Sequence, residues 1–152
     1  MATSTLLQKL DVQADGFGPS TSNRRQVETF LSAGVIAAGD WVQFNTAASD
    51  ANRVLSVIEA TDTFANGNPL VVGVALDAAS AAGQSVRVVV SGYAEGANVD
   101  NGVAAAGVAL VVDNTGAGIA NAIAAADTSP ACGVSLEAAA AGKCDVWVFK
   151  QF

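Results

Sequence analysis

The alternation of apolar and polar residues along this chain is typical of short β-strands. It is clearest at residues 85–91, where Val86, Val88 and Val90 fall on one face and Arg87 and Val89 on the other. Six further runs rich in valine and aromatic residues have the composition and length of strands. These runs cover residues 41–44, 53–58, 70–76, 108–112, 133–136 and 145–149.

Turn residues separate the predicted strands. An Ala-Gly-Asp turn stands at 38–40, and an Asn-Gly-Asn-Pro cluster stands at 66–69. The alanine-rich segment 77–83 predicts a loop or a single helical turn, and SGYAEGANVDN at 91–101 predicts a linker. Short strands that recur about every 8–15 residues, with Gly, Asn and Pro between them, indicate a β-sandwich or a β-barrel.

The chain contains two diverged copies of one unit. GVALDAASAAGQSVRVVV at 73–90 aligns with GVSLEAAAAGKCDVWVF at 133–149 after one deletion. The match extends back to GVIAAGDWVQFNT and GVAAAGVALVVDNT, again with one gap, so that the copies cover about 34–90 and 102–149. A duplicated unit rich in valine and turn residues is typical of a structural scaffold. We therefore predict an all-β fold, a compact β-barrel or sandwich with pseudo-twofold symmetry.

One segment gives conflicting signals. IANAIAAAD at 119–127 has helical propensity, but its counterpart RVLSVIEATD in the first copy has the pattern of a strand. We let the repeat decide and predict a strand.

Residues 1–30 do not belong to the repeat, and we interpret them as an irregular N-terminal arm before a β-barrel-like domain at 31–152. Leu6, Leu7 and Leu10 form an apolar patch at helical spacing that is too short to hold a helix by itself. Two interpretations stay open: an arm that is ordered by contact with a partner, or a disordered tail.

Charge and hydropathy exclude two classes of partner. The chain has 152 residues and a net charge of −7, and its seven basic residues form no stripe, which argues against nucleic-acid binding. No apolar run approaches the roughly 20 residues of a membrane span, and no signal peptide is evident, so we expect no membrane partner and synthesis in a cytoplasm.

The sequence offers little for catalysis, and we predict that the protein is not an enzyme and uses no cofactor or metal. There is no histidine, the usual general base and metal ligand. Asp77 and Glu137 occupy equivalent places in the two copies, where we expect each to cap the turn after its strand rather than to form a catalytic pair. Gly142-Lys143 lacks the flanking residues of a phosphate loop.

Cysteine and tryptophan are interpreted as core residues. Cys132 and Cys144 could lie on neighbouring strands, and a disulfide is not demanded; in a reducing compartment we expect two buried thiols. Trp41 and Trp147 each fall in a predicted strand, with core packing as the default and an exposed aromatic ligand platform as the alternative.

The segments GDWVQF and GVALDAASAAGQSVRVVVSG resemble small head decoration (cement) proteins of tailed bacteriophages. In that family an AGD-type turn precedes a strand, and a GVAL-like strand is followed by an alanine-rich turn and a valine strand. The resemblance covers about 34–149. The second copy departs from the pattern with Val108 in place of the acid and Lys143 in place of the glutamine.

The resemblance implies a β-barrel-like homotrimer that sits at local threefold positions between major capsid subunits, on the outer capsid surface of the virion. As such a protein, it would be made in the host cytoplasm and would stabilise the shell. A head fibre base, a tail accessory protein and a non-viral soluble binding module are the alternatives. The arm would add contacts to the capsid through Leu6, Leu7, Leu10, Phe17, Arg24 and Arg25.

Overall fold

The computed structural model describes residues 25–49, 52–61, 67–112, 116–124 and 131–149. Within these ranges the chain forms nine strands and one helical turn, which confirms the predicted all-β class. The elements are β1 (Arg25–Ser32), β2 (Trp41–Phe44), α2 (Asn52–Leu55), β3 (Ser56–Glu59), β4 (Val71–Ala75), β5 (Ser85–Asn98), β6 (Ala109–Val111), β7 (Asn121–Ala122), β8 (Gly133–Ser135) and β9 (Lys143–Val148).

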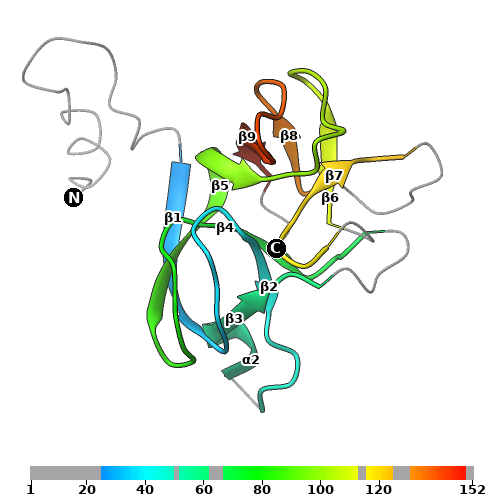
Figure 1. Cartoon of the computed structure of the whole chain (residues 1–152). Coiled ribbons are helices and arrows are strands. Elements are labelled where there is room, and N and C mark those ends of the chain that lie inside the picture. Colours follow the sequence, from blue (N-terminus) through cyan, green and yellow to red (C-terminus); the bar gives the residue numbers. More distant parts are fainter. Residues whose placement is uncertain (1–24, 50–51, 62–66, 113–115, 125–130, 150–152) are drawn as a thin grey trace, which may run out of the picture.

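The first five strands close into a barrel, which occupies the blue to green lobe of Figure 1. The order of pairing is β1-β3-β2-β4-β5, and β1 closes the ring because it pairs parallel with β3 and antiparallel with β5. Closure removes most of the exposed strand edges that an open sheet would present to other chains.

The second half of the chain repeats this order of pairing. The C-terminal part of β5 pairs with β9, and the order continues through β8 and β6 to β7. A parallel bridge between Val99 and Ala120 completes the ring at the place where β1 meets β3 in the first copy. Strand β5 is thus the last strand of the first barrel and the first strand of the second (Figure 1).

The structure corrects the predicted boundaries of the repeat. The glycines and asparagines of segment 91–101 predict a linker, but β5 runs through it to Asn98 with a register shift between Ala94 and Ala97. That strand half is the counterpart of β1, which begins at Arg25, inside the segment predicted as an irregular arm. Each copy therefore starts one strand earlier than the sequence match indicates.

The alignment of the copies also needs a deletion of two residues rather than one. Ala75 pairs with Val88 in the first hairpin, and Ser135 pairs with Val146 in the second, so the second connection is two residues shorter. Arg87 is then the counterpart of Asp145, and Val89 is the counterpart of Trp147. The second deleted residue is hard to detect in the sequence. Because valines alternate along these strands, shifting the alignment of the two copies by one residue leaves them nearly as similar.

With that alignment, the two barrel cores contain equivalent side chains. Val86, Val88 and Val90 point into the first barrel, as their predicted common face requires. Each has a buried counterpart in the second. The matched core pairs are Val42 and Leu110, Val72 and Cys132, Val86 and Cys144, Val88 and Val146, and Val90 and Val148.

The outer face of the first barrel packs against the second barrel. Trp41, Val74 and Val89 stand side by side across β2, β4 and β5, and all three belong to the core cluster of the second barrel. The Trp41 indole Nε1 donates a hydrogen bond to the carbonyl oxygen of Asn98 at 3.1 Å. The outer face of the first barrel therefore forms part of the hydrophobic core of the second barrel, whereas the inside of the first barrel is a separate core cluster.

Two further strand predictions are correct only in part. Residues 53–58 are predicted as one strand, but α2 takes the first part, and β3 begins at Ser56. The side chains of Val54 and Leu55 are exposed. The apolar residues at the start of this run therefore have no buried face to form, and the strand begins only after them. In the segment 119–127, β7 contains only Asn121 and Ala122, and residues 125–127 lie outside the described residues.

Candidate functional site

The predicted capsid-contact residues are almost entirely beyond the described part of the chain. Leu6, Leu7, Leu10, Phe17 and Arg24 lie outside the described residues. Arg25 is the first residue of β1, where it is half-buried and pairs with Gly92 in the middle of β5. The structure thus places one of the six residues, next to the junction of the barrels, and leaves the arm hypothesis untested.

A hollow of about 440 Å³ lies where the two barrels meet, and both polar and apolar residues line it. The first barrel contributes two carboxylates, one from the turn before β2 and one from β3. The second barrel contributes carboxylate, carboxamide and apolar side chains. The lining residues are Asp40, Glu59, Asn98, Val99, Asp100, Asn101, Ala117, Ile119 and Gly142.

Asp40 in this hollow has a structural task. One carboxylate oxygen accepts a hydrogen bond from the Ala37 backbone N–H at 2.6 Å, which closes the predicted Ala-Gly-Asp turn. The other accepts a hydrogen bond from the Asn98 side-chain amide, also at 2.6 Å. Because both oxygens are engaged, Asp40 joins the first barrel to β5 of the second. The second copy has Val108 at the equivalent position, and its side chain cannot accept these two hydrogen bonds.

Glu59 is the second carboxylate of the hollow. Burial, together with the negative charge of Asp40, raises the pKa of Glu59 above its ordinary value. Gly118 lies against both acids: a Cβ atom there would be 2.9 Å from Glu59 Oε1 and 3.1 Å from Asp40 Cγ, and its φ of +71° also favours glycine. The hollow therefore offers hydrogen-bond acceptors to a hydrogen-bond donor or a cation. The carboxylates of Asp40 and Glu59 both face Gly118, and their negative charges repel each other.

The described residues contain no group of three or more His, Cys, Asp or Glu side chains that could hold a metal ion. The described part of the hollow also lacks a thiol or hydroxyl nucleophile beside its carboxylates. Chemically, it can accept hydrogen bonds and attract positive charge.

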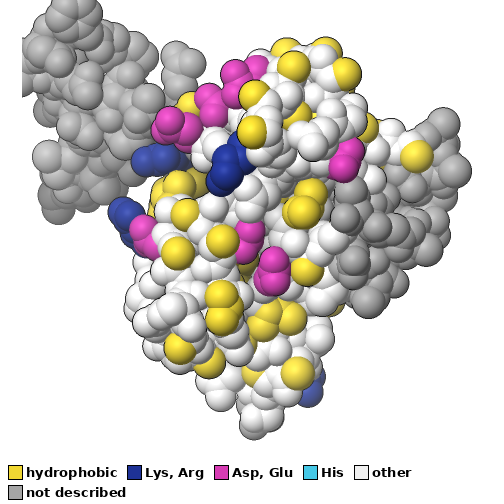
Figure 2. All heavy atoms as spheres, viewed as in Figure 1, with side chains coloured by type: hydrophobic (Ala, Val, Ile, Leu, Met, Phe, Trp, Pro, Cys, Tyr) yellow, Lys and Arg dark blue, Asp and Glu magenta, His cyan; other side chains and the backbone are white. Residues whose placement is uncertain are grey.

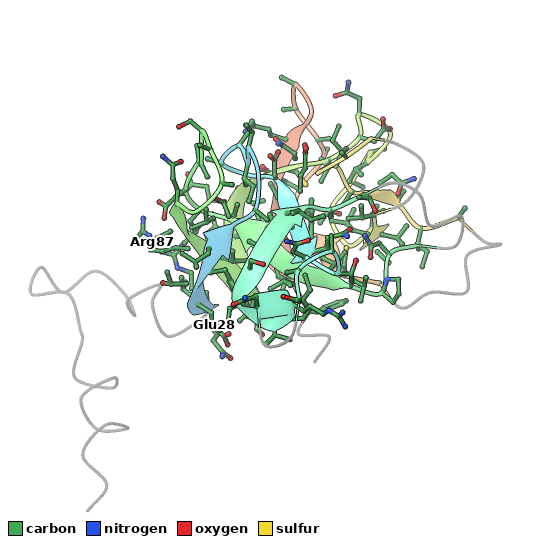
Figure 3. The ribbon with its side chains drawn as sticks, turned by 90° about the horizontal axis from the view of Figure 1, so that it is seen from below. Glu28 and Arg87 are labelled. Carbon is green, nitrogen blue, oxygen red and sulfur yellow. The ribbon has the colours of Figure 1, made fainter. Side chains whose placement is uncertain are left out.

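Asp77 and Glu137 each accept hydrogen bonds within their own hairpin, but from the opposite strand rather than from the turn that they were predicted to cap. Asp77 accepts two hydrogen bonds from the Arg87 guanidinium, at 2.7 and 2.8 Å, and one from its backbone N–H at 3.2 Å. The guanidinium hydrogen bond lowers the pKa of Asp77. Glu137 accepts a hydrogen bond from the Asp145 backbone N–H at 3.2 Å. Figure 3 shows Arg87 projecting from the outside of the first barrel, near Glu28 of β1.

Asp145, the counterpart of Arg87, has different partners. Its carboxylate accepts a hydrogen bond from the Tyr93 hydroxyl at 2.7 Å and another from the Gly96 backbone N–H at 3.0 Å. The hydrogen bond to Asp145 raises the pKa of Tyr93 to about 12. These bonds fix the register-shifted part of β5 against β9.

The two cysteines are buried and unpaired with each other, as predicted. They are the counterparts of Val72 and Val86 in the first core; Cys132 lies directly before β8, and Cys144 lies on the neighbouring strand β9. Burial raises the pKa of Cys132 to about 12 and that of Cys144 to about 11. Neither thiol has the lowered pKa that an activated nucleophile needs.

The tryptophans differ, so the default prediction of core packing is right for Trp41 and wrong for Trp147. Trp41 is fully buried, whereas the Trp147 side chain is 39% exposed on the outer face of the second barrel. In β9, Val146 and Val148 point into the core, so the alternation itself indicates that Trp147 points outward. This local signal outweighs the general preference of Trp for burial, on which the default prediction depends.

Figure 2 shows one face of the protein, on which acidic side chains gather along the upper left edge and stand singly elsewhere among uncharged surface. The described ranges contain no helix with the length and hydropathy of a membrane span. No protein-family profile matches this chain, and no curated protein matches its sequence.

Proposed function

We propose that this protein decorates and stabilises the outer surface of a tailed-phage capsid, as a homotrimeric cement protein bound to the major capsid protein at local threefold positions. The observation that carries the proposal is the duplicated hairpin. The Gly-Val-Ala-Leu and valine strands on which the resemblance rests are β4 and the first half of β5, and β8 and β9 repeat them. The motifs that resemble decoration proteins are thus the strands that build the scaffold itself.

The use of charged groups supports a structural role. Asp40, Asp77, Glu137 and Asp145 each accept hydrogen bonds that close a turn, a hairpin or the barrel junction. A protein that binds only the assembled shell stabilises that shell by mass action, without any chemistry at its own groups. Many identical contacts of modest strength would add up over the particle.

The decisive experiment is the ratio of this chain to the major capsid protein in purified particles, measured by quantitative mass spectrometry. A ratio near one to one is expected for a protein that covers the shell. A few copies per particle would instead indicate a head fibre base or a tail accessory protein. Complete absence from particles would refute the structural proposal.

The arm is tested separately by removing residues 1–24, which leaves β1 intact from Arg25 onward. The expected result is loss of binding to particles that lack the protein, with an unchanged far-UV circular dichroism spectrum. Unchanged binding would show that Leu6, Leu7, Leu10, Phe17 and Arg24 make no essential contact.

The hollow between the barrels favours a second candidate, a soluble binding module. Its carboxylates and loop amides would suit a ligand with several donors or a positive charge. A small molecule that raises the melting temperature of the wild type, but not of Glu59→Gln, would support this alternative.

A further inference from the structure

A short segment of the second copy, residues 116–120, crosses the junction and bonds to the first barrel. The Gly118 backbone N–H donates a hydrogen bond to the Ala60 carbonyl oxygen at 2.8 Å, and the Gly118 carbonyl oxygen accepts one from the Trp41 N–H at 3.0 Å. The Ala60 N–H in turn donates to the Trp41 carbonyl oxygen at 2.8 Å. Gly118 thus continues the hydrogen bonding between the ends of β2 and β3. We call residues 116–120 the clasp.

The clasp also belongs to the ring of the second barrel. The Ala120 N–H donates to the Asn98 carbonyl oxygen at 3.1 Å, and the Ala120 carbonyl oxygen accepts from the Asp100 N–H at 2.8 Å. These two hydrogen bonds make up the bridge between Val99 and Ala120 that completes this ring. Because both barrels bond to the clasp, a change in its contacts changes how firmly the barrels are joined.

Two carboxylates of the first barrel lie against Gly118. A Cβ atom there would be 2.9 Å from Glu59 Oε1 and 3.1 Å from Asp40 Cγ, so both acids are close to the same point. Like charges repel, and they repel more strongly where burial reduces screening by water. Both oxygens of Asp40 already accept hydrogen bonds, from Ala37 and Asn98. A proton on Asp40 would displace one of these donors, which makes Glu59 the better place for a proton.

Two further charged groups of the described residues lie close by. Asp100, in the turn after β5, also lines the hollow and adds a third acid. Lys143 of β9 faces the turn before β2, with its Nζ 3.3 Å from the position that a Cβ on Gly39 would take. Burial, and then the charge of Asp40, raises the pKa of Glu59 despite the presence of this lysine. Geometry and electrostatics agree that a negative charge on Glu59 is unfavourable in the folded protein.

We propose that the clasp is sensitive to pH: a proton on Glu59 tightens the junction between the barrels, and loss of that proton loosens it. When Glu59 is neutral, the repulsion from Asp40 beside Gly118 disappears. When Glu59 is charged, the hollow of about 440 Å³ gives its side chain room to turn away from Asp40, and Gly118 loses a neighbour that holds it in place.

The direction of the pH effect follows from the shift of the Glu59 carboxyl. Folding raises its pKa above the ordinary value of 4.5, so the folded protein binds the proton more tightly than the unfolded chain does. The contribution to stability is therefore complete below pH 4.5, and it is lost as the pH rises through the higher pKa of the folded state.

Urea unfolding of the wild type and of Glu59→Gln, at about pH 7 and about pH 4, tests this coupling. Glutamine imitates the protonated carboxyl at both pH values. We expect a higher urea midpoint for Glu59→Gln than for the wild type at neutral pH, and equal midpoints in acid. Glu95→Gln is the matched control, because it makes the same change of charge at an exposed position of β5 that does not line the hollow. It should leave the difference between the two pH values as in the wild type.

Hydrogen exchange measured by NMR locates the effect. In the wild type, protection of the Gly118 amide, relative to its intrinsic exchange rate at each pH, should increase as the pH falls. In Glu59→Gln it should not depend on pH. The Ile36 amide, which donates to the Ala79 carbonyl oxygen at 2.9 Å in the first barrel, is the control and should be protected equally at both pH values.

Three outcomes would overturn the inference. The first is a lower stability of Glu59→Gln than of the wild type at neutral pH. The second is a difference between the two proteins that is the same at both pH values, which would mean that Glu59 acts through packing alone. The third is Gly118 protection that does not follow the pH. If Glu59→Gln fails to fold, the carbon-13 titration of the Glu59 carboxyl in the wild type decides, since a midpoint at or below 4.5 also contradicts the inference. None of these measurements involves particles, so they are independent of the proposed function.

Discussion

Replacing each tryptophan by alanine tests how much the packing between the two barrels contributes to stability. Trp41 is fully buried, and its indole lies against Gly133 of the second barrel, where an added Cβ would be only 3.0 Å from the ring. Trp147 has the same chemistry but is 39% exposed. The two substitutions therefore remove the same atoms from a buried and from a partly exposed position.

The expected cost of Trp41→Ala is about 4 kcal/mol in the free energy of unfolding, within the range of large-to-small core substitutions. The lost hydrogen bond adds little, because the Asn98 carbonyl oxygen keeps a second donor, the Ala120 backbone N–H at 3.1 Å. Most of the cost is thus lost packing between the barrels. Trp147→Ala should cost about 1 kcal/mol or less, as is usual for surface positions.

Urea unfolding followed by far-UV circular dichroism, at low protein concentration, measures both values. Single domains of this size usually unfold in one cooperative transition, which allows linear extrapolation to water. Equal costs for the two variants would refute the reasoning, as would a cost for Trp41→Ala below about 1 kcal/mol. Either result would mean that the barrels are stable without the indole between them.

Three further outcomes follow from the structure. Gly73→Ala should destabilise the fold by about 3 kcal/mol or more in urea unfolding, because its Cβ would be 2.0 Å from a backbone carbonyl oxygen of β5, whereas Gly34→Ala, with open space around it, should be nearly neutral. The only tyrosine, Tyr93, should titrate at about 12 in ultraviolet absorbance, and Asp145→Asn should move that midpoint down towards 10. Since folding raises the pKa of Tyr93, its contribution to stability is full below about pH 10 and is lost as the pH rises towards 12, a loss that Tyr93→Phe should remove. Both cysteine thiols should resist Ellman's reagent at pH 8 in the native protein and react fully in urea; rapid reaction of the native protein would contradict their burial.

Local pattern is enough to predict the all-β class, the duplication and most of the strands. Val86, Val88 and Val90 alternate with residues that point the other way, and a period of two is typical of a strand with one face in the core. The AGD turn is also predictable, since Asp at its end accepts a backbone hydrogen bond within three residues.

The double use of β5 could not be predicted in this way. Its second half contains Gly92 and Gly96, which are typical of turns, and only the partners on either side make it a strand. The candidate site depends on the same long-range information. Whether Trp41 is covered on the outer face of the first barrel, and whether Asp40 meets Asn98, is decided by how the barrels pack and not by the neighbouring residues in the chain.

The continuous strand β5 has a mechanical consequence. Two modules joined by a flexible tether can move independently, and a pull on one reaches the other only after the tether is taut. Here the fourteen residues of β5 run through both barrels, and the strand pairs with β1 and β4 in the first barrel and with β9 in the second. A load applied to one barrel therefore passes directly into the other as shear along rows of hydrogen bonds, and the chain responds to tension as one stiff body.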